Sequence, residues 1–443
     1  EGIAALIESA EKLPFTFGVA ASSCVPESPF ASAGAAFGTD DVRRLIEEFG
    51  AIGVAEVMNY PAVINGDPMF RDIIATAGWR RVDGHAPGLR GNQLDAYIAA
   101  GVESDHETFT PAEAHEKRQK GMWVFLRQGS VCQDLVELLP SVVKHGPMGS
   151  SFCTDDREPD LLRDEGHLNH CIRLAVGAGQ EVIDAFSTAS YFPAMYHNFF
   201  HLGQLGPGYQ ADVVVFDSLE GFVPKMVLQK GRVVAREGRI LDGVVPQTSP
   251  PQSLYNRVNL HHVPTADELT IEPPANGMAN VIGVKSGTVR TTALKLDLTD
   301  PANDIARIAV VERHKATGGV TNAFVTGFGY DVDCAVASTV AHDSHHMIVV
   351  GTNKEDMAQA ANILKDIGGG LVLVSEGKEL ARVEMPIAGL MSDERAEIVA
   401  EKAGRLVAAM KACGCNLNNA NMQHSLLALV VIPELRISDE GLI

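Results

Sequence analysis

A series of polar residues, spaced at the length of one strand-helix unit, limits the possible folds of this chain more than any other feature of its sequence. From Phe15 to about Met195, short apolar runs alternate with longer amphipathic stretches, which is typical of βα units around a parallel sheet. One polar residue follows each of five consecutive runs: Glu56, His85, His106, Arg127 and Asp155. Because parallel strands end at the same edge of a sheet, we predict that these side chains meet at one rim.

The predicted secondary structure follows the same alternation. The segment Thr39 to Phe49 is expected to be a helix with Thr39 as N-cap, and Thr110 to Lys120 a helix with Pro111 at its first position. Six strands are predicted: Phe15 to Ala21, Ile52 to Met58, Trp79 to Gly84, Gly101 to Asp105, Met122 to Leu126 and Gly149 to Cys153. The first part of the chain is therefore assigned to the α/β class.

The residue pattern and composition of the sequence change twice after this region. Residues 201–247 hold closely spaced β-runs, which predict a small antiparallel unit, and residues 248–275 are rich in Pro, Ser, Gln and Asn, as in a linker. Residues 276–443 mix strands and helices and are expected to form a second domain. Within it, Thr352 and Glu355 have the spacing of a capping box at a helix start.

Charge and cysteine content exclude some classes of function. Lys and Arg number 36 against 56 Asp and Glu, so the formal charge is −20, which repels nucleic acids and anionic membranes. Seven cysteines include no CxxC pair, and the sequence shows neither a secretory signal nor an apolar run of spanning length. We therefore expect a cytoplasmic protein that binds neither nucleic acid nor membrane.

The polar series has the chemistry of a metal site. Two imidazoles with carboxylate oxygens suit a divalent transition ion such as Mn, Fe or Zn, and such an ion makes water acidic enough to ionise near neutral pH. Taken singly, each residue has another interpretation. A lone His near a strand end is more often a hydrogen-bonded structural residue, and Glu56 or Asp155 could pair with an arginine such as Arg157 or cap a helix.

Several motifs resemble a known family. The segment HLGQLGPGYQADVVVFDSLEGFVPKMVLQKGRVV, residues 201–234, resembles the part of amidohydrolases that leaves the barrel. AEVMNYPAVI, VDGHAPGL, AAGVESDHET and CTDDREP resemble the adenine deaminase family more closely than other branches, and TVAHDSHHMIVVG and PIAGLMS resemble its additional domain. The resemblance implies strands three to eight of a (β/α)8 barrel in residues 1–200, a small β-sandwich in 201–247, and an additional C-terminal α/β (α+β) domain in 276–443.

The resemblance also implies roles for individual residues. Glu56 would bridge two divalent metals (Mn or Fe, with Zn as a further candidate), with His85, His106 and Asp155 as further ligands. Asp155 would act with Glu56 in catalysis, as the base that passes a proton from water to the leaving amine during deamination of adenine to hypoxanthine. Substrate contacts are expected from Arg127, Gln128, His342 and His345. The two histidines could equally belong to a loop network.

The chain departs from the family pattern in two places. The family has a His-x-His pair at its first barrel strand, and this chain has none, so roughly the first hundred residues of the barrel are expected to be absent. Relatives tend to read R-E-G-S where this chain has Gln128. Two alternatives stay open: a hydrolase of another cyclic amide or amidine, similar to dihydroorotase or allantoinase, and a metal-free scaffold. We also expect a homodimer or higher homo-oligomer.

Overall fold

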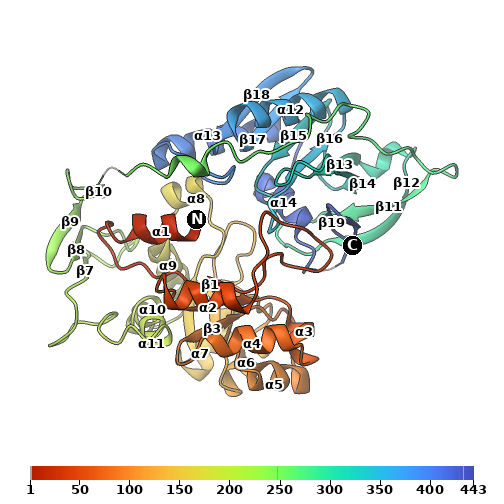
Figure 1. Cartoon of the computed structure of the whole chain (residues 1–443). Helices are drawn as coiled ribbons and strands as arrows, with labels where there is room; N and C mark the ends of the chain where they lie inside the picture. The colour runs from red at the N-terminus through yellow and green to blue at the C-terminus, as the bar shows by residue number, and fades with distance from the viewer. Residues whose placement is uncertain (1, 247, 433) are drawn as a thin grey trace.

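The chain folds into two lobes, which Figure 1 shows below and above the middle of the molecule. The computed structural model describes residues 2–246, 248–432 and 434–443. The lower lobe, in red to yellow, holds the parallel strands of the N-terminal half, and the upper lobe, in teal to blue, holds a larger sheet. Among the described helices, none combines the length and the apolar character that a membrane crossing requires.

Six parallel strands follow one another in sequence order through the lower lobe. They form two hydrogen-bonded sheets, and the gap between them is bridged by the Glu103 N–H, which donates to Val82 O at 2.9 Å. The strands are β1 (Ala21–Ser22), β2 (Gly53–Val57), β3 (Arg81–Gly84), β4 (Ser104–Asp105), β5 (Trp123–Arg127) and β6 (Ser150–Cys153). Because they are parallel and consecutive, their carboxyl ends lie at one edge.

Helices follow the strands, as the alternating pattern predicts. Val54, Val82 and Leu94 lie in the apolar core between strands and helices. The helices of this lobe are α1 (Gly2–Ala10), α2 (Thr39–Glu47), α3 (Tyr60–Ile64), α4 (Pro68–Thr76), α5 (Gly91–Ala99), α6 (Pro111–Gln119), α7 (Leu135–His145), α8 (Pro159–Asp164), α9 (Leu168–Gly177), α10 (Val182–Ala189) and α11 (Tyr191–Tyr196). Thr110 is confirmed as an N-cap, since its hydroxyl accepts the Glu113 N–H at 3.2 Å.

Two of the local predictions are wrong. The first strand is not Phe15 to Ala21, since β1 has only two residues; Ile52 N–H donates to Val19 O, so only the end of the run joins its neighbour. Phe15 and Phe17 stay half-exposed and pack edge to face. Thr39 is not an N-cap, because Gly38 takes that place and its N–H is accepted by Asp41 at 2.9 Å.

A small antiparallel sheet and an irregular strap connect the lobes. The strands are β7 (Val213–Val215), β8 (Met226–Gln229), β9 (Arg232–Arg236) and β10 (Arg239–Ile240). Lys230 and Gly231 join β8 to β9, both with positive φ, as a two-residue hairpin requires. The strap from 248 to 275 has one short 3-10 helix, Gln252–Leu254. It is not a free linker, because Val258 and Leu269 are buried in the core of the upper lobe.

The upper lobe is built on an eight-stranded sheet with helices on both faces. Its order is β12-β11-β14-β13-β16-β15-β17-β18, and every neighbouring pair except β11 with β14 is antiparallel. The strands are β11 (Met278–Gly283), β12 (Thr292–Asp297), β13 (Ile305–Val311), β14 (Val320–Thr326), β15 (Cys334–Ser338), β16 (Met347–Gly351), β17 (Gly370–Ser375) and β18 (Lys378–Glu384). A short hairpin, β19 (Ile437–Ser438) and β20 (Gly441–Leu442), follows near the C-terminus.

Alternating side chains bury the two faces of this sheet under different helices. Val349 packs with Met357 and Leu364 of α12 (Lys354–Ile367), while Val350 packs with Leu406 of α13 (Ala396–Ala412). A shorter helix, α14 (Ala420–Ser425), follows α13. Helix α13 reaches across to α8 of the lower lobe.

The predicted capping box at the start of α12 is wrong by one residue. Asn353 is the N-cap, and its side chain accepts the N–H groups of Glu355 and Asp356, each at 3.0 Å. The Thr352 hydroxyl instead accepts the Cys334 N–H from β15. The helix ends at Gly368, which adopts a left-handed conformation with φ of 80°.

Candidate metal centre and active site

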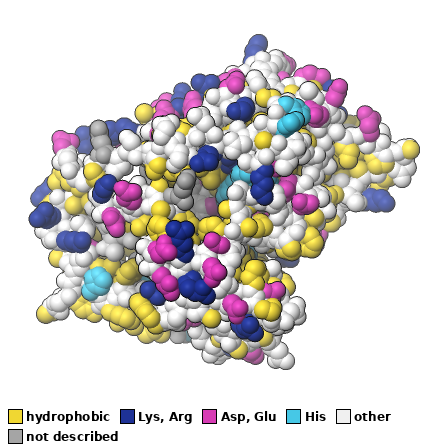
Figure 2. Space-filling view, in the orientation of Figure 1, with side chains coloured by type: hydrophobic (Ala, Val, Ile, Leu, Met, Phe, Trp, Pro, Cys, Tyr) yellow, Lys and Arg dark blue, Asp and Glu magenta, His cyan; other side chains and the backbone are white. Residues whose placement is uncertain are grey.

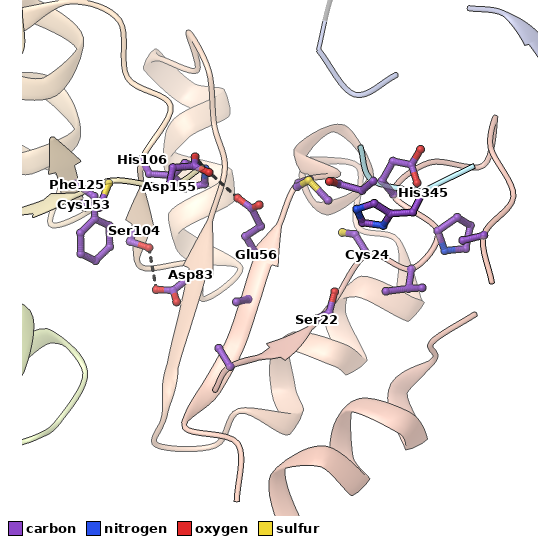
Figure 3. Close-up of a pocket in the computed structure, with 18 of the residues that line it drawn as sticks. Ser22, Cys24, Glu56, Asp83, Ser104, His106, Phe125, Cys153, Asp155 and His345 are labelled. Atoms are coloured by element: carbon purple, nitrogen blue, oxygen red, sulfur yellow. Dashed lines mark hydrogen bonds and ion pairs between the residues drawn. The ribbon is translucent and has the colours of Figure 1, made fainter. Parts of the chain in front are cut away.

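Four of the predicted residues come together at the carboxyl ends of the parallel strands. Glu56 is the last residue but one of β2, His85 directly follows β3, His106 directly follows β4, and Asp155 lies two residues after β6. Glu56 Oε2 is 3.0 Å from His106 Nε2 and 3.7 Å from His85 Nδ1. His106 Nε2 is also 3.6 Å from Asp155 Oδ2. Figure 3 shows Glu56 facing His106 and Asp155 across the space between their strands.

The arrangement of donor atoms fits a divalent cation. One ligand atom each from Glu56, His85 and His106 lie within 4.8 Å of one another, and the same holds for His106, Glu107 and Asp155. Glu56 Oε2, the oxygen that faces both histidines, is buried and has no hydrogen-bond partner among the described residues. A buried carboxylate oxygen of this kind, with imidazole nitrogens of His85 and His106 beside it, is what a metal requires, and mixed nitrogen and oxygen ligands suit Zn, Mn or Fe.

The electrostatics of the cluster favour positive charge at its centre. Burial alone would raise the pKa of Glu56, but His106 and His85 hold it well below its usual range. Burial would likewise lower the pKa of His106, yet Glu56 and Asp155 raise it to about 10. A proton on His106 thus compensates the two carboxylates, and a cation bound at the same place would do so in its stead.

Arg127 lies behind Asp155. Its guanidinium is buried, with Nη1 donating to Asp155 Oδ2 at 2.9 Å and paired with the Glu107 carboxylate, and with Nη2 3.4 Å from Asp134. Against the effect of burial, Arg127 and His106 keep the pKa of Asp155 below its usual value. Asp155 is therefore an anion near neutral pH, as a general base must be.

A cavity of about 690 Å³ opens beside these ligands. Glu56, His106 and Asp155 line one end, and the close-up in Figure 3 shows Cys24 and His345 at the other. The remaining wall includes Asp83, Ser104 and Phe125 on β3 to β5, and Glu27 in the loop after β1. A smaller cavity of about 70 Å³ adjoins the same ligands and is closed by apolar residues of the upper lobe: Val289, Leu426, Leu429 and Ile432.

The two predicted histidines of the upper lobe line different cavities. His345 and Asp343 border the larger cavity, and His342 borders the smaller one. Burial lowers the pKa of His345 to about 3, so its ring is neutral. Burial would also lower the pKa of His342, but Asp343, whose Oδ1 is 3.1 Å from His342 Nδ1, raises it. Gln128 borders neither of these two cavities, and its Oε1 is buried without a hydrogen-bond partner among the described residues.

Three residues of the candidate site are not predicted by the sequence pattern: Glu107, Asp83 and Glu27. Glu107 pairs with Arg127 and joins the second ligand group, and its position directly after a strand-end histidine could have revealed it. Asp83 lines the floor of the cavity and accepts hydrogen bonds from Tyr196 at 2.7 Å and Ser104 at 3.1 Å. Glu27 lies in an irregular loop, where no periodic pattern marks it.

Comparison with known families defines the class of protein to which this fold and site belong. The model described as "Amidohydrolase family" matches residues 1–234, and the model described as "Adenine deaminase C-terminal domain" matches residues 283–443. The protein is thus an amidohydrolase with mixed α/β architecture.

Full-length relatives narrow this class. Adenine deaminase 3 of Rhizobium meliloti (strain 1021) is 46% identical over 460 residues, which cover 100% of this chain and 77% of the relative. Adenine deaminase of Mesorhizobium japonicum is 44% identical, with 100% of this chain and 76% of the relative covered. Adenine deaminase 2 of Carboxydothermus hydrogenoformans is 37% identical, covering 100% and 78%. The chain belongs to the adenine deaminase family.

Proposed function

We infer that the protein catalyses the hydrolytic deamination of adenine, which converts adenine and water into hypoxanthine and ammonia. The observation that carries this inference is the convergence of Glu56, His85, His106 and Asp155 at one end of a cavity, in a chain whose whole length matches adenine deaminases. Its volume of about 690 Å³ is in the range typical of small-molecule sites.

We propose that two divalent ions, Mn or Fe with Zn as a further candidate, occupy this site. Glu56, His85 and His106 would hold one ion, and Glu107 and Asp155, which lie beside His106, would contribute oxygen ligands to the second. Glu56 lies nearest to both histidines and is the candidate for a bridging carboxylate. When bound, such an ion supplies Lewis acidity, which brings the pKa of water toward neutrality.

Asp155 is placed to move the protons of the reaction. Its carboxylate borders the cavity and is held by Arg127, so it can take a proton from water as the water oxygen bonds to C6 of the purine. The same proton is then delivered to the exocyclic nitrogen, the C6–N bond breaks, and ammonia leaves. Arg127 acts here by orienting Asp155, because both of its Nη atoms pair with carboxylates and it does not border the larger cavity.

The wall of the cavity supplies the substrate contacts. His345 is neutral, so its imidazole can donate one hydrogen bond and accept another, which suits a purine edge with both kinds of group. His342 lies beside the ligands from the smaller cavity. Gln128 remains a candidate only through its buried amide oxygen, which has no hydrogen-bond partner among the described residues. The residue contacts with adenine are thus proposed to come from both lobes.

The architecture is proposed to be that of a (β/α)8 amidohydrolase barrel, to which residues 1–200 contribute. The six consecutive parallel strands and their helices support this assignment. Residues 201–247 would belong to the accompanying β-sandwich, and residues 276–443 form the additional domain. Acidic and basic side chains are interspersed on the face seen in Figure 2, and its described residues form no continuous basic stripe of the kind that nucleic acids bind.

A substrate comparison tests the function. The purified protein, supplied with Mn²⁺, is expected to release ammonia from adenine and to form hypoxanthine in equal amount. Dihydroorotate and allantoin should give no product, because their hydrolysis opens a ring, whereas the proposed reaction replaces an exocyclic amine of a purine. Ring opening of either compound, with adenine left intact, would favour the alternative of a cyclic-amide hydrolase. A protein that binds metal and turns over none of the three would contradict the proposed activity.

A further inference from the structure

A lysine with no exposed surface lies directly beneath the proposed metal ligands. Lys117, on α6, is 0% exposed, and its ammonium, which has three N–H groups, lies within hydrogen-bond distance of four oxygens: Glu113 Oε1 at 2.6 Å, Ala86 O at 2.8 Å, Asp105 Oδ2 at 2.8 Å and Thr108 Oγ1 at 3.3 Å. Burial would lower the pKa of Lys117, but Asp105 and Glu113 raise it, so the ammonium stays charged. A buried charge is costly unless it is fully paired, and this one is.

Asp105 connects this lysine to both histidine-bearing loops. Its Oδ1 accepts the Ala86 N–H at 2.7 Å and the Glu107 N–H at 3.2 Å. Its Oδ2 accepts the Thr108 hydroxyl at 2.5 Å in addition to the lysine. Ala86 and Glu107 are the residues that directly follow His85 and His106. One fully buried carboxylate thus fixes the main chain beside both imidazoles.

Glu113 extends the same contacts along the two loops. Its Oε1 accepts the Gly88 N–H at 2.9 Å, and its Oε2 accepts the Phe109 N–H at 3.3 Å. The loop after β3 and the loop after β4 are therefore held by a single group of buried polar and charged side chains. We call this group the Lys117 clamp: Asp105, Thr108, Glu113 and Lys117. None of the four borders either cavity beside the ligands.

We propose that the Lys117 clamp positions His85 and His106 for metal binding by fixing the main chain beside both residues. A metal-binding His usually owes its orientation to a hydrogen bond from its other ring nitrogen. Here the Nε2 of His85 is buried and has no such partner among the described residues. The ring orientation must therefore be set by the loop that carries it, and the clamp fixes that loop. This inference rests on the metal site proposed above.

The clamp could instead serve stability alone, and two matched threonine variants separate these roles. Thr108→Val keeps the shape of the side chain and removes one arm of the clamp. Thr188→Val, on α10 of the same lobe, removes an equally buried hydroxyl that bonds Asp184 O at 2.7 Å and Gln180 Nε2 at 3.1 Å, away from both loops. Both variants are expected to melt at a lower temperature than the wild type.

Titration of the metal-free full chain with Mn²⁺, read by competition with a chromophoric chelator, is the test. Thr108→Val should bind Mn²⁺ about 10-fold more weakly than the wild type, and Thr188→Val should bind it as the wild type does. Activity of Thr108→Val at limiting Mn²⁺ should recover at saturating Mn²⁺, with KM for adenine unchanged. Lys117→Met should weaken binding further, by about 100-fold, if it folds.

Equal Mn²⁺ affinity for Thr108→Val and the wild type, with only a lower melting temperature, would overturn the positioning role. The same conclusion would follow if Thr188→Val lost as much affinity as Thr108→Val, because the effect would then track stability. A wild type that binds no Mn²⁺, Fe²⁺ or Zn²⁺ would instead contradict the metal site itself, and the inference with it.

Discussion

The two lobes differ in strand direction, and only the lobe with parallel strands collects chemical groups at one point. In the lower lobe, Glu56, His85, His106 and Asp155 all lie at carboxyl ends of parallel strands and therefore meet at one edge. In the upper lobe most neighbours are antiparallel, so successive strands end at opposite edges. In a parallel sheet, polar residues that follow successive strands at a regular sequence spacing lie together at one edge. In an antiparallel sheet the same spacing would place them alternately at opposite edges.

The upper lobe contributes by packing against the lower one. The segment between β15 and β16 brings Asp343 and His345 to the larger cavity, and Ser344 between them donates to the Glu27 carboxylate at 2.9 Å. Nearby, His346 Nε2 lies 3.0 Å from Ser32 O, and Ser32 in turn bonds Asp439. This part of the seam between the lobes is therefore polar, and it forms one wall of the candidate active site.

The largest effect on activity should come from the parallel edge. Asp155→Asn removes the proposed proton carrier and keeps its size, so kcat should fall by about 10²- to 10⁴-fold while most of the metal remains bound. Asp164→Asn, which alters an exposed acid paired with Arg163 after the same strand, is the control and should retain full activity. Steady-state kinetics with metal analysis decides, and near-normal turnover by Asp155→Asn would remove this residue as the base.

The antiparallel core should show the opposite behaviour, with loss of stability and unchanged chemistry. Leu373→Ala leaves a cavity at a fully buried position on β17 and should reduce the free energy of unfolding by about 2–5 kcal/mol. Leu380→Ala, at an exposed position on β18, should change it by less than about 0.5 kcal/mol. Denaturant unfolding measures both. A fall in kcat per folded molecule of Leu373→Ala would contradict this prediction, because it would show that packing in the upper lobe affects catalysis in the lower lobe.

The seam should be sensitive to pH through Glu27. Burial raises the pKa of Glu27 to about 7 from an ordinary value of 4.5, although the Ser344 hydroxyl lowers it. Between these two values the unfolded chain ionises while the folded one keeps its proton. The stability that this proton confers is thus complete below about pH 4.5 and is lost as the pH rises through 7, by up to about 3 kcal/mol.

Glu27→Gln tests this dependence, because the amide cannot titrate. The free energy of unfolding of the variant, relative to the wild type, should rise between about pH 5 and about pH 8. A difference that stays constant over this range would mean that Glu27 has the same pKa in the folded and unfolded chains.

The smallest effect is expected at the wall that the upper lobe supplies. His345→Ala removes one neutral hydrogen-bonding group from the cavity, so KM for adenine should rise by about 2- to 10-fold with little change in kcat. His170→Ala is a matched control, because His170 pairs with Glu165 and Arg173 and borders neither cavity. If both variants have the wild-type KM, the upper lobe makes no contact with the substrate through His345.

Sequence periodicity could predict that Glu56, His85, His106 and Asp155 converge, because their convergence depends on strand direction and spacing alone. His85 and His106 follow their strands directly, and both lie where the spacing places them. The first strand was misassigned, since the apolar run from Phe15 extends beyond the two residues that pair with β2. Glu27 could not be predicted, because its partner Ser344 is 317 residues away and their contact depends on how the lobes pack.

Anomalous diffraction from crystals of the Zn²⁺-loaded protein is the sharpest test of the proposed metal site. We predict a zinc peak within about 2.0–2.2 Å of the Glu56 carboxylate and of ring nitrogens of both His85 and His106. Adenine turnover by a protein whose zinc lies away from these three side chains, or which binds no metal there, would contradict the account.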